Sequence, residues 1–159
     1  FEESKTRPMG RGASGVRGIT LANHDDEVVG MVSVNDMDTN VLVVSENGFG
    51  KRSDLEDYRM TNRGGKGVKT ISITEKTGTL VTLKNVNDED DLMIINKSGI
   101  AIRMAVSDLR VMGRATQGVK LINLKGGDAI AAVAKVMKDD DDDLEDITDI
   151  DVEGDTIID

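Results

Sequence analysis

The sequence predicts an all-β, propeller-like fold made of repeated units, and two observations lead to that prediction. First, a basic, glycine-rich motif occurs three times, as RGASGV at 11–16, RGGKGV at 63–68 and RATQGV at 114–119. The steps between copies are 52 and 51 residues, a period typical of propellers and repeat arrays. Second, each copy leads into segments rich in Val, Ile and Leu, separated by Gly, Asn and Asp, as in short antiparallel strands.

The motif spacing divides residues 1–137 into about three four-stranded antiparallel blades. We expect repeats near 11–62, 63–113 and 114–137, with residues 1–10 ending a preceding blade. In the order of the chain, strands are expected at 16–21, 27–34, 40–45, 49–53, 68–74, 79–86, 91–96, 100–105, 119–124 and 129–136. Asn47–Gly48 and Ser98–Gly99 are the turn signals of two hairpins. The chain opens on Phe1 rather than Met, which predicts a piece of a longer protein.

Charge is divided unevenly along the chain. The 159 residues carry a net charge of −10, yet residues 139–159 hold 12 acidic side chains and no Lys or Arg. The first 138 residues therefore hold 18 acidic and 20 basic side chains. We expect a mildly basic body followed by a separate acidic tail at 138–159. Two interpretations of the tail stay open: it regulates binding by competing with an anionic ligand for the basic body, through Asp139, Asp140, Asp141, Asp142 and Asp143, or it only keeps the chain in solution.

Several kinds of site are excluded or disfavoured by the composition. The absence of Cys rules out disulfides and thiolate metal sites, and the single His24 sits beside Asp25 and Asp26 in an expected turn. Residues 10–15 match G-x-G-x-x-G, but a dinucleotide fingerprint follows a strand and opens a helix, whereas this copy precedes a β segment. No catalytic constellation is found, no metal is expected, and no apolar segment approaches a membrane span of about 20 residues.

Basic residues recur in register with the motif. The candidate DNA-binding residues are Arg11, Arg17, Lys51, Arg52, Arg63, Lys66, Lys69, Arg103, Arg114 and Lys120. The accompanying loop glycines are Gly15, Gly64, Gly65, Gly67 and Gly118. Equivalent positions of successive blades lie in rows, and a cationic row that exposes loop N–H groups suits phosphate groups. The alternative is that the motif arginines fasten the loops through carbonyl groups and the glycines only permit a turn.

The aromatic content narrows the class of nucleic acid. Phe1, Phe49 and Tyr58 are the only aromatic residues, 2% of the chain. Readers of single strands and of RNA commonly stack bases on aromatic side chains. Contact with the phosphates of a duplex, independent of base sequence, is therefore the favoured interpretation.

The motif strings resemble the C-terminal domain of the DNA gyrase A subunit over about residues 4–137. The resemblance rests on RPMGRGASGVRGITL, on the 36 residues that begin with ENGFGKRSDLEDYRM, and on SGIAIRMAVSDLRVMGRATQGVKLINL. It implies a β-pinwheel that wraps duplex DNA around a basic outer rim and serves negative supercoiling. It also implies a non-catalytic domain without a cofactor, ATP and Mg²⁺ being used elsewhere in a cytoplasmic holoenzyme that contains the gyrase B subunit and a second A subunit.

The resemblance has two departures, and other functions stay open. The family's Gln-Arg-Arg-Gly-Gly-Lys-Gly box retains only its last five residues at 63–67, because Thr61 and Asn62 replace the first two. Tyr58 is not the family's strand-passing tyrosine, which belongs to another domain.

Two alternative functions stay open: the DNA-bending domain of topoisomerase IV and a protein-binding propeller with no nucleic-acid role. Three blades leave strand edges open, so self-association is also expected.

Overall fold

The computed structural model describes residues 1–137, so the expectations about the acidic tail, including Asp139–Asp143, lie outside the described residues. Within them the all-β prediction is confirmed. Three single 3-10 turns accompany the strands: η1 (Glu3–Lys5), η2 (Leu55–Asp57) and η3 (Val106–Asp108). The strands are β1 (Asn40–Ser45), β2 (Phe49–Asp54), β3 (Leu80–Val86), β4 (Asp90–Asn96), β5 (Ala101–Ala105), β6 (Val119–Lys120) and β7 (Ile130–Met137).

The first sheet takes its strands from three successive repeats. Its order is β3-β1-β2-β6, and every pairing is antiparallel. The hairpin of β1 and β2 comes from the first repeat, β3 from the second and β6 from the third. In register, Val43 lies opposite Lys51 on one side and Leu83 on the other. This sheet therefore crosses the repeat boundaries at 62 and 113 that the motif spacing predicts.

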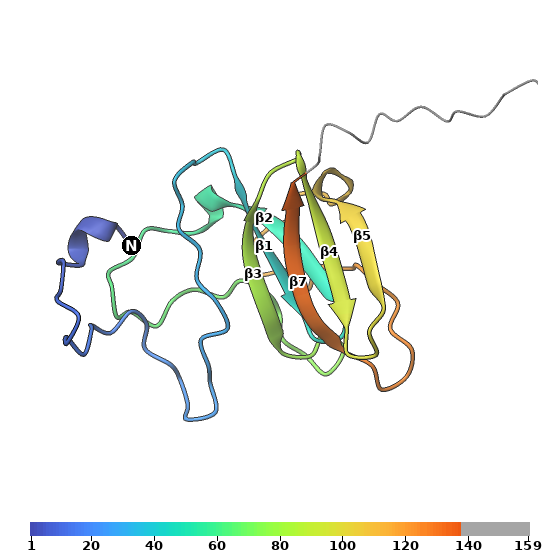
Figure 1. Ribbon diagram of the computed structural model, residues 1–159, viewed down its shortest axis with the longest axis horizontal. Helices are drawn as coiled ribbons and strands as arrows, with labels where there is room; N and C mark the ends of the chain where they lie inside the picture. The colour runs from blue at the N-terminus through green and yellow to red at the C-terminus, as the bar shows by residue number, and fades with distance from the viewer. Residues whose placement is uncertain (138–159) are drawn as a thin grey trace, which may run out of the picture.

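The second sheet likewise joins a hairpin of one repeat to a strand of the next repeat. Its order is β5-β4-β7, again antiparallel, with the β4–β5 hairpin from the second repeat and β7 from the third. The two sheets stand face to face, and the chain before β1 extends to one side of them (Figure 1). The Asn47–Gly48 and Ser98–Gly99 turns close the two hairpins, and both glycines have positive φ, 80° and 88°.

Three of the expected strands are not formed, and the described residues contain two sheets rather than three blades. Residues 16–21, 27–34 and 68–74 form no strand. One repeat later, the counterpart of 27–34 is β3, which pairs with a hairpin of the preceding repeat. Within residues 1–137 no such hairpin precedes 27–34. Its apolar side chains therefore stay uncovered: Met31 is 89% exposed and Val28 is 64% exposed.

The core lies on both faces of β1, because alternate residues of a strand point to opposite faces. Leu42 and Val44 face the second sheet and pack in a cluster with Leu92, Ile94 and Ile130. Their neighbours Val41 and Val43 join Ile71, with Leu55 and Tyr58 at the edge of that second cluster. A strand covered on both faces explains the continuous apolar segment VLVV. It also places the residues of the adjacent strand β2 in the interior.

Candidate nucleic-acid interface

The second motif loop lies directly on the segment that follows the first motif. Gly64 N–H donates to the carbonyl of Gly18 over 2.8 Å, and Thr20 N–H donates to the carbonyl of Gly65 over 2.9 Å. The hydroxyl of Thr20 also donates to the carbonyl of Gly64, at 2.6 Å. The repeated loops are thus joined by backbone hydrogen bonds that the sequence period alone does not reveal.

The third motif loop lies on the segment after the second motif in the same way. Ser72 N–H donates to the carbonyl of Thr116 over 3.1 Å. The motif arginines repeat one contact: Arg63 Nη1 donates to the carbonyl of Arg17 over 2.9 Å, and Arg114 Nη1 donates to the carbonyl of Lys69 over 2.7 Å. Successive motifs therefore lie side by side in one row.

Arg63 and Arg114 consequently hold the loops together, which is the alternative that the sequence left open. Arg114 makes a further bond from Nε to the carbonyl of Asp57, at 2.9 Å. Both arginines are half-buried, so part of each guanidinium is committed to backbone carbonyls. Their primary role in the structure is to fix the spacing of the row.

The exposed charges of the row belong mainly to other predicted residues. Arg17, Lys69 and Lys120 each stand six residues after a motif arginine, and all three side chains are exposed. Lys66 and Arg11 are exposed as well. Within the described part of the chain these five side chains make no hydrogen bond or ion pair, so their charges are available to a ligand. We call them the cationic row.

Lys51 does not belong to this surface, which corrects the prediction. It is fully buried, and its ammonium donates to the hydroxyl of Ser53 over 2.9 Å, to the carbonyl of Gly113 over 2.7 Å and to the carbonyl of Arg114. Burial lowers the pKa of Lys51 to about 8, against the opposing field of Asp57. Lys51 therefore fastens the third motif loop from inside.

Arg52 is also interior, 7% exposed. Its Nε donates to the carbonyl of Leu109, and its Nη1 forms an ion pair with Asp88. Arg103, the equivalent residue of the next repeat, pairs through Nε with Asp91 over 2.7 Å, with its side chain 41% exposed. These arginines recur in register, but Lys51 and Arg52 are buried and do not present the surface charge that we expected of them.

Four of the five predicted loop glycines have a positive φ, which favours glycine. They are Gly15, Gly64, Gly67 and Gly118, with φ of 79°, 78°, 77° and 83°, and Gly65 is the exception. Gly118 is under a second constraint, since a Cβ there would lie 2.6 Å from the carbonyl oxygen of Gly50. The glycines are thus required by the turns and by close packing of backbone on β2.

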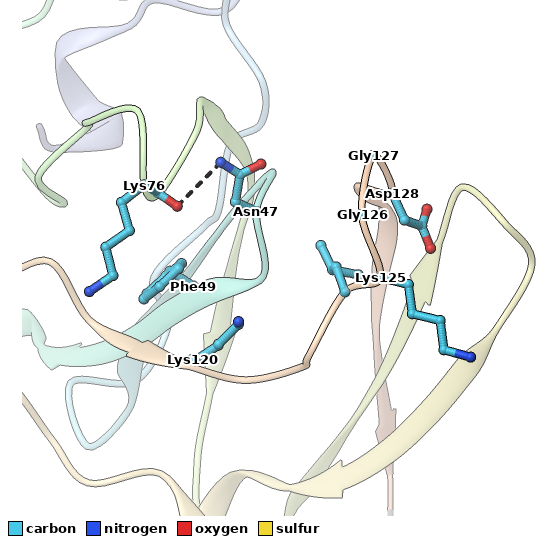
Figure 2. Close-up of a pocket in the computed structure, with 9 residues that line it drawn as sticks. Asn47, Phe49, Lys76, Lys120, Lys125, Gly126, Gly127 and Asp128 are labelled. Atoms are coloured by element: carbon cyan, nitrogen blue, oxygen red, sulfur yellow. Dashed lines mark hydrogen bonds between the residues drawn. The ribbon is translucent and has the colours of Figure 1, made fainter.

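Two lysines near the row were missed by the sequence analysis. Lys76 and Lys125 are exposed and, with Lys120, line a cavity beside Phe49, although the Lys125 side chain points away from Phe49 (Figure 2). Neither recurs at the motif period, so an analysis built on repeats had no signal for them.

Among residues 1–137 no group of His, Asp and Glu is placed to hold a metal ion. The same residues include no helix with the length and hydropathy needed to cross a bilayer.

The row of loops and the two interleaved sheets can be compared with known proteins. The family model described as "DNA gyrase C-terminal domain, beta-propeller" matches residues 1–35, 39–87 and 90–137. The chain belongs to this family. That membership confirms the resemblance drawn from the motif strings.

Two relatives are DNA gyrase A subunits of Staphylococcus aureus. The protein of strain MRSA252 is 51% identical over 148 residues, which cover 92% of this chain and 16% of the relative. The protein of strain NCTC 8325 / PS 47 is 51% identical over 141 residues, or 87% of this chain and 16% of the relative. The chain thus spans about a sixth of the length of these curated relatives.

Solved structures agree on the fold. A DNA gyrase A C-terminal domain superposes with a TM-score of 0.76 at 27% identity, covering 85% of this chain and 45% of that one. The C-terminal domain of DNA topoisomerase IV superposes with a TM-score of 0.80 at 21% identity, covering 86% of this chain and 42% of that one. At that identity the second likeness concerns the fold alone.

Proposed function

We propose that this chain binds duplex DNA through its phosphates, without reading bases, and guides the duplex along the cationic row. The supporting observation is that Arg17, Lys69 and Lys120 occupy equivalent places on successive, hydrogen-bonded motif segments and carry unpaired charge. Phosphate contacts from Lys and Arg release counterions, and this favours binding to any sequence. Membership of the gyrase family and the similarity to DNA gyrase A subunits support DNA as the ligand.

In this proposal the bound duplex is bent and wrapped, in the service of negative supercoiling by DNA gyrase. Smooth bending of 20–30 base pairs costs about 1–6 kcal/mol, which several phosphate contacts offset. The chain itself cuts no DNA, hydrolyses no ATP and needs no cofactor. Its partners are the gyrase B subunit and a second A subunit in the bacterial cytoplasm.

Sealing a nicked circular DNA in the presence of the chain should leave a shifted linking number in the sealed DNA. An unchanged linking number would refute wrapping.

Neutralising the cationic row should weaken DNA binding and its salt dependence together. We expect the triple variant Arg17→Gln, Lys66→Gln and Lys69→Gln to lose at least about tenfold in affinity near 0.1 M salt. The slope of log K against log salt should fall by about 0.9 for each phosphate that is no longer neutralised. Fluorescence anisotropy with duplexes of two unrelated sequences measures both quantities.

The matched control for that experiment is Lys97→Gln. Lys97 is 64% exposed on the β4–β5 turn and lies 3.9 Å from Glu46, so the change removes one positive charge outside the row, against three in the triple variant. It should leave affinity and slope almost unchanged. If the loss of binding free energy per removed charge is equal in both variants, only the net charge of the chain matters. A wild-type slope near zero would refute phosphate binding.

A further inference from the structure

A cavity of about 290 Å³ opens at the end of the first sheet where three repeats meet. Its walls are the β1–β2 turn, the turn at 74–78 and the segment 120–128 (Figure 2). We call it the lysine pocket and define it by Asn47, Phe49, Lys76, Lys120, Leu124 and Lys125. It adjoins the cationic row at Lys120, which lies opposite Phe49 in the sheet.

The lysine pocket carries an excess of positive charge. Lys76 Nζ lies 5.2 Å from the centroid of the Phe49 ring, and among the described residues Lys120 and Lys125 have no ion-pair partner. The one carboxylate in the lining is engaged elsewhere: Asp128 accepts the Ser98 hydroxyl at 2.8 Å and Ala129 N–H at 2.9 Å. The bond from Ser98 is the main reason that the pKa of Asp128 is lowered. The lining thus holds three lysines and one carboxylate, and the lysines outnumber the carboxylate although its hydrogen bonds leave its negative charge in place.

The walls are fixed before any ligand arrives. Asn47 Nδ2 donates to the carbonyls of Glu75 and Lys76 over 3.0 and 3.2 Å, which ties two walls together. Thr77 is fully buried behind the second wall and donates from its hydroxyl to the carbonyl of Ser72. The third wall is held by Leu121 N–H, which donates to the carbonyl of Gly48 over 2.8 Å. A pre-formed site loses less entropy on binding than one that must first be ordered.

From this geometry we infer that the lysine pocket binds a phosphate of the DNA backbone together with its deoxyribose. The ammonium groups match the anionic phosphate, whereas the partly exposed side chain of Leu124 offers apolar surface to the carbon face of a sugar. The volume exceeds what a phosphate alone would fill. This inference rests on the proposed function and extends it, because it adds a discrete site, built from three repeats, to a row of separate surface charges.

The test uses the chain with ¹⁵N-labelled amides and two probes, inorganic phosphate and a duplex of about 30 base pairs. We expect both probes to shift the amide resonances of Gly126 and Gly127 in the pocket wall. The double variant Lys76→Gln with Lys125→Gln should abolish those shifts and lower duplex affinity about tenfold, as the removal of two phosphate-binding charges requires. The control Lys97→Gln removes a charge on the neighbouring turn and should change neither.

The outcomes separate this inference from the proposed function. If the duplex shifts the resonances of Lys66 and Lys69 but not those of the pocket, the lysine pocket is no DNA site and the row still stands. A pocket that responds to inorganic phosphate alone also overturns the inference, since the source would then be free phosphate. If the duplex shifts nothing and does not bind, the proposed function fails as well.

Discussion

Replacing Gly118 with alanine is expected to destabilise the chain by about 3 kcal/mol, through two additive effects. The φ of 83° is disfavoured for residues with a side chain. In addition, the new Cβ would lie 2.6 Å from the carbonyl oxygen of Gly50, and backbone on both sides leaves little room to adjust. The third motif loop should therefore detach from β2. Urea denaturation measures the loss, and amide exchange should increase at Val119, whose strand β6 pairs with β2.

The matched control is Gly99→Ala. Gly99 has a φ of 88°, but nothing lies within 4 Å of an added Cβ. Only the backbone strain of the positive φ should destabilise this variant, by about 1 kcal/mol. If the two variants lose equal stability, the close approach of Gly118 to Gly50 adds no strain, and the loss in both reports only the positive φ.

Lys51→Met is expected to cost about 2 kcal/mol at neutral pH, because the carbonyls of Gly113 and Arg114 lose a charged donor. Methionine keeps most of the volume of the buried side chain, so the loss reports the hydrogen bonds rather than a cavity. The loop that carries Arg114 should loosen, and duplex affinity should fall even though Lys51 touches no DNA. Chemical denaturation, with anisotropy on the same samples, tests both effects.

The pH dependence of the same variant gives an independent check. The pKa of Lys51 is lowered to about 8 in the folded chain, against about 10.4 when unfolded. Between those values the unfolded chain binds more protons, so Lys51 makes the free energy of unfolding rise with pH across that window. The wild-type advantage over Lys51→Met should therefore grow from pH 8 to pH 10. The exposed-site control Lys97→Met should show no such growth, and a flat difference for Lys51→Met would mean that its pKa is not lowered.

The motif spacing predicted the fold class and the row, because equivalent residues of repeats occupy equivalent places. It could not distinguish Arg17 and Lys69, which are exposed, from Lys51 and Arg52, which are buried. All four recur or flank a recurring residue, and the repeat period does not indicate how deeply a side chain is buried. Every residue of β2 from Phe49 to Ser53 is buried, on both faces of the strand, so alternation along β2 does not mark Lys51 either.

The strand prediction failed where a segment depends on another repeat for its partner. Residues 27–34 have the alternation and the β-branched residues of β3, yet only β3 finds a hairpin to pair with. Strand formation here is decided by hydrogen-bonding neighbours rather than by local preference. The lysine pocket escaped prediction for a related reason, since Lys76 and Phe49 come together only through the exchange of strands between repeats.

That exchange also sets the timing of folding during synthesis. β2 ends at Asp54, but its outer edge is covered only by Val111, Met112 and β6, which ends at Lys120. A ribosome adding 5–20 residues per second needs about 3–13 s to make the intervening chain. For that interval the edge of the nascent hairpin, with Lys51 and Arg52 still lacking their carbonyl acceptors, stays open to pairing with other chains.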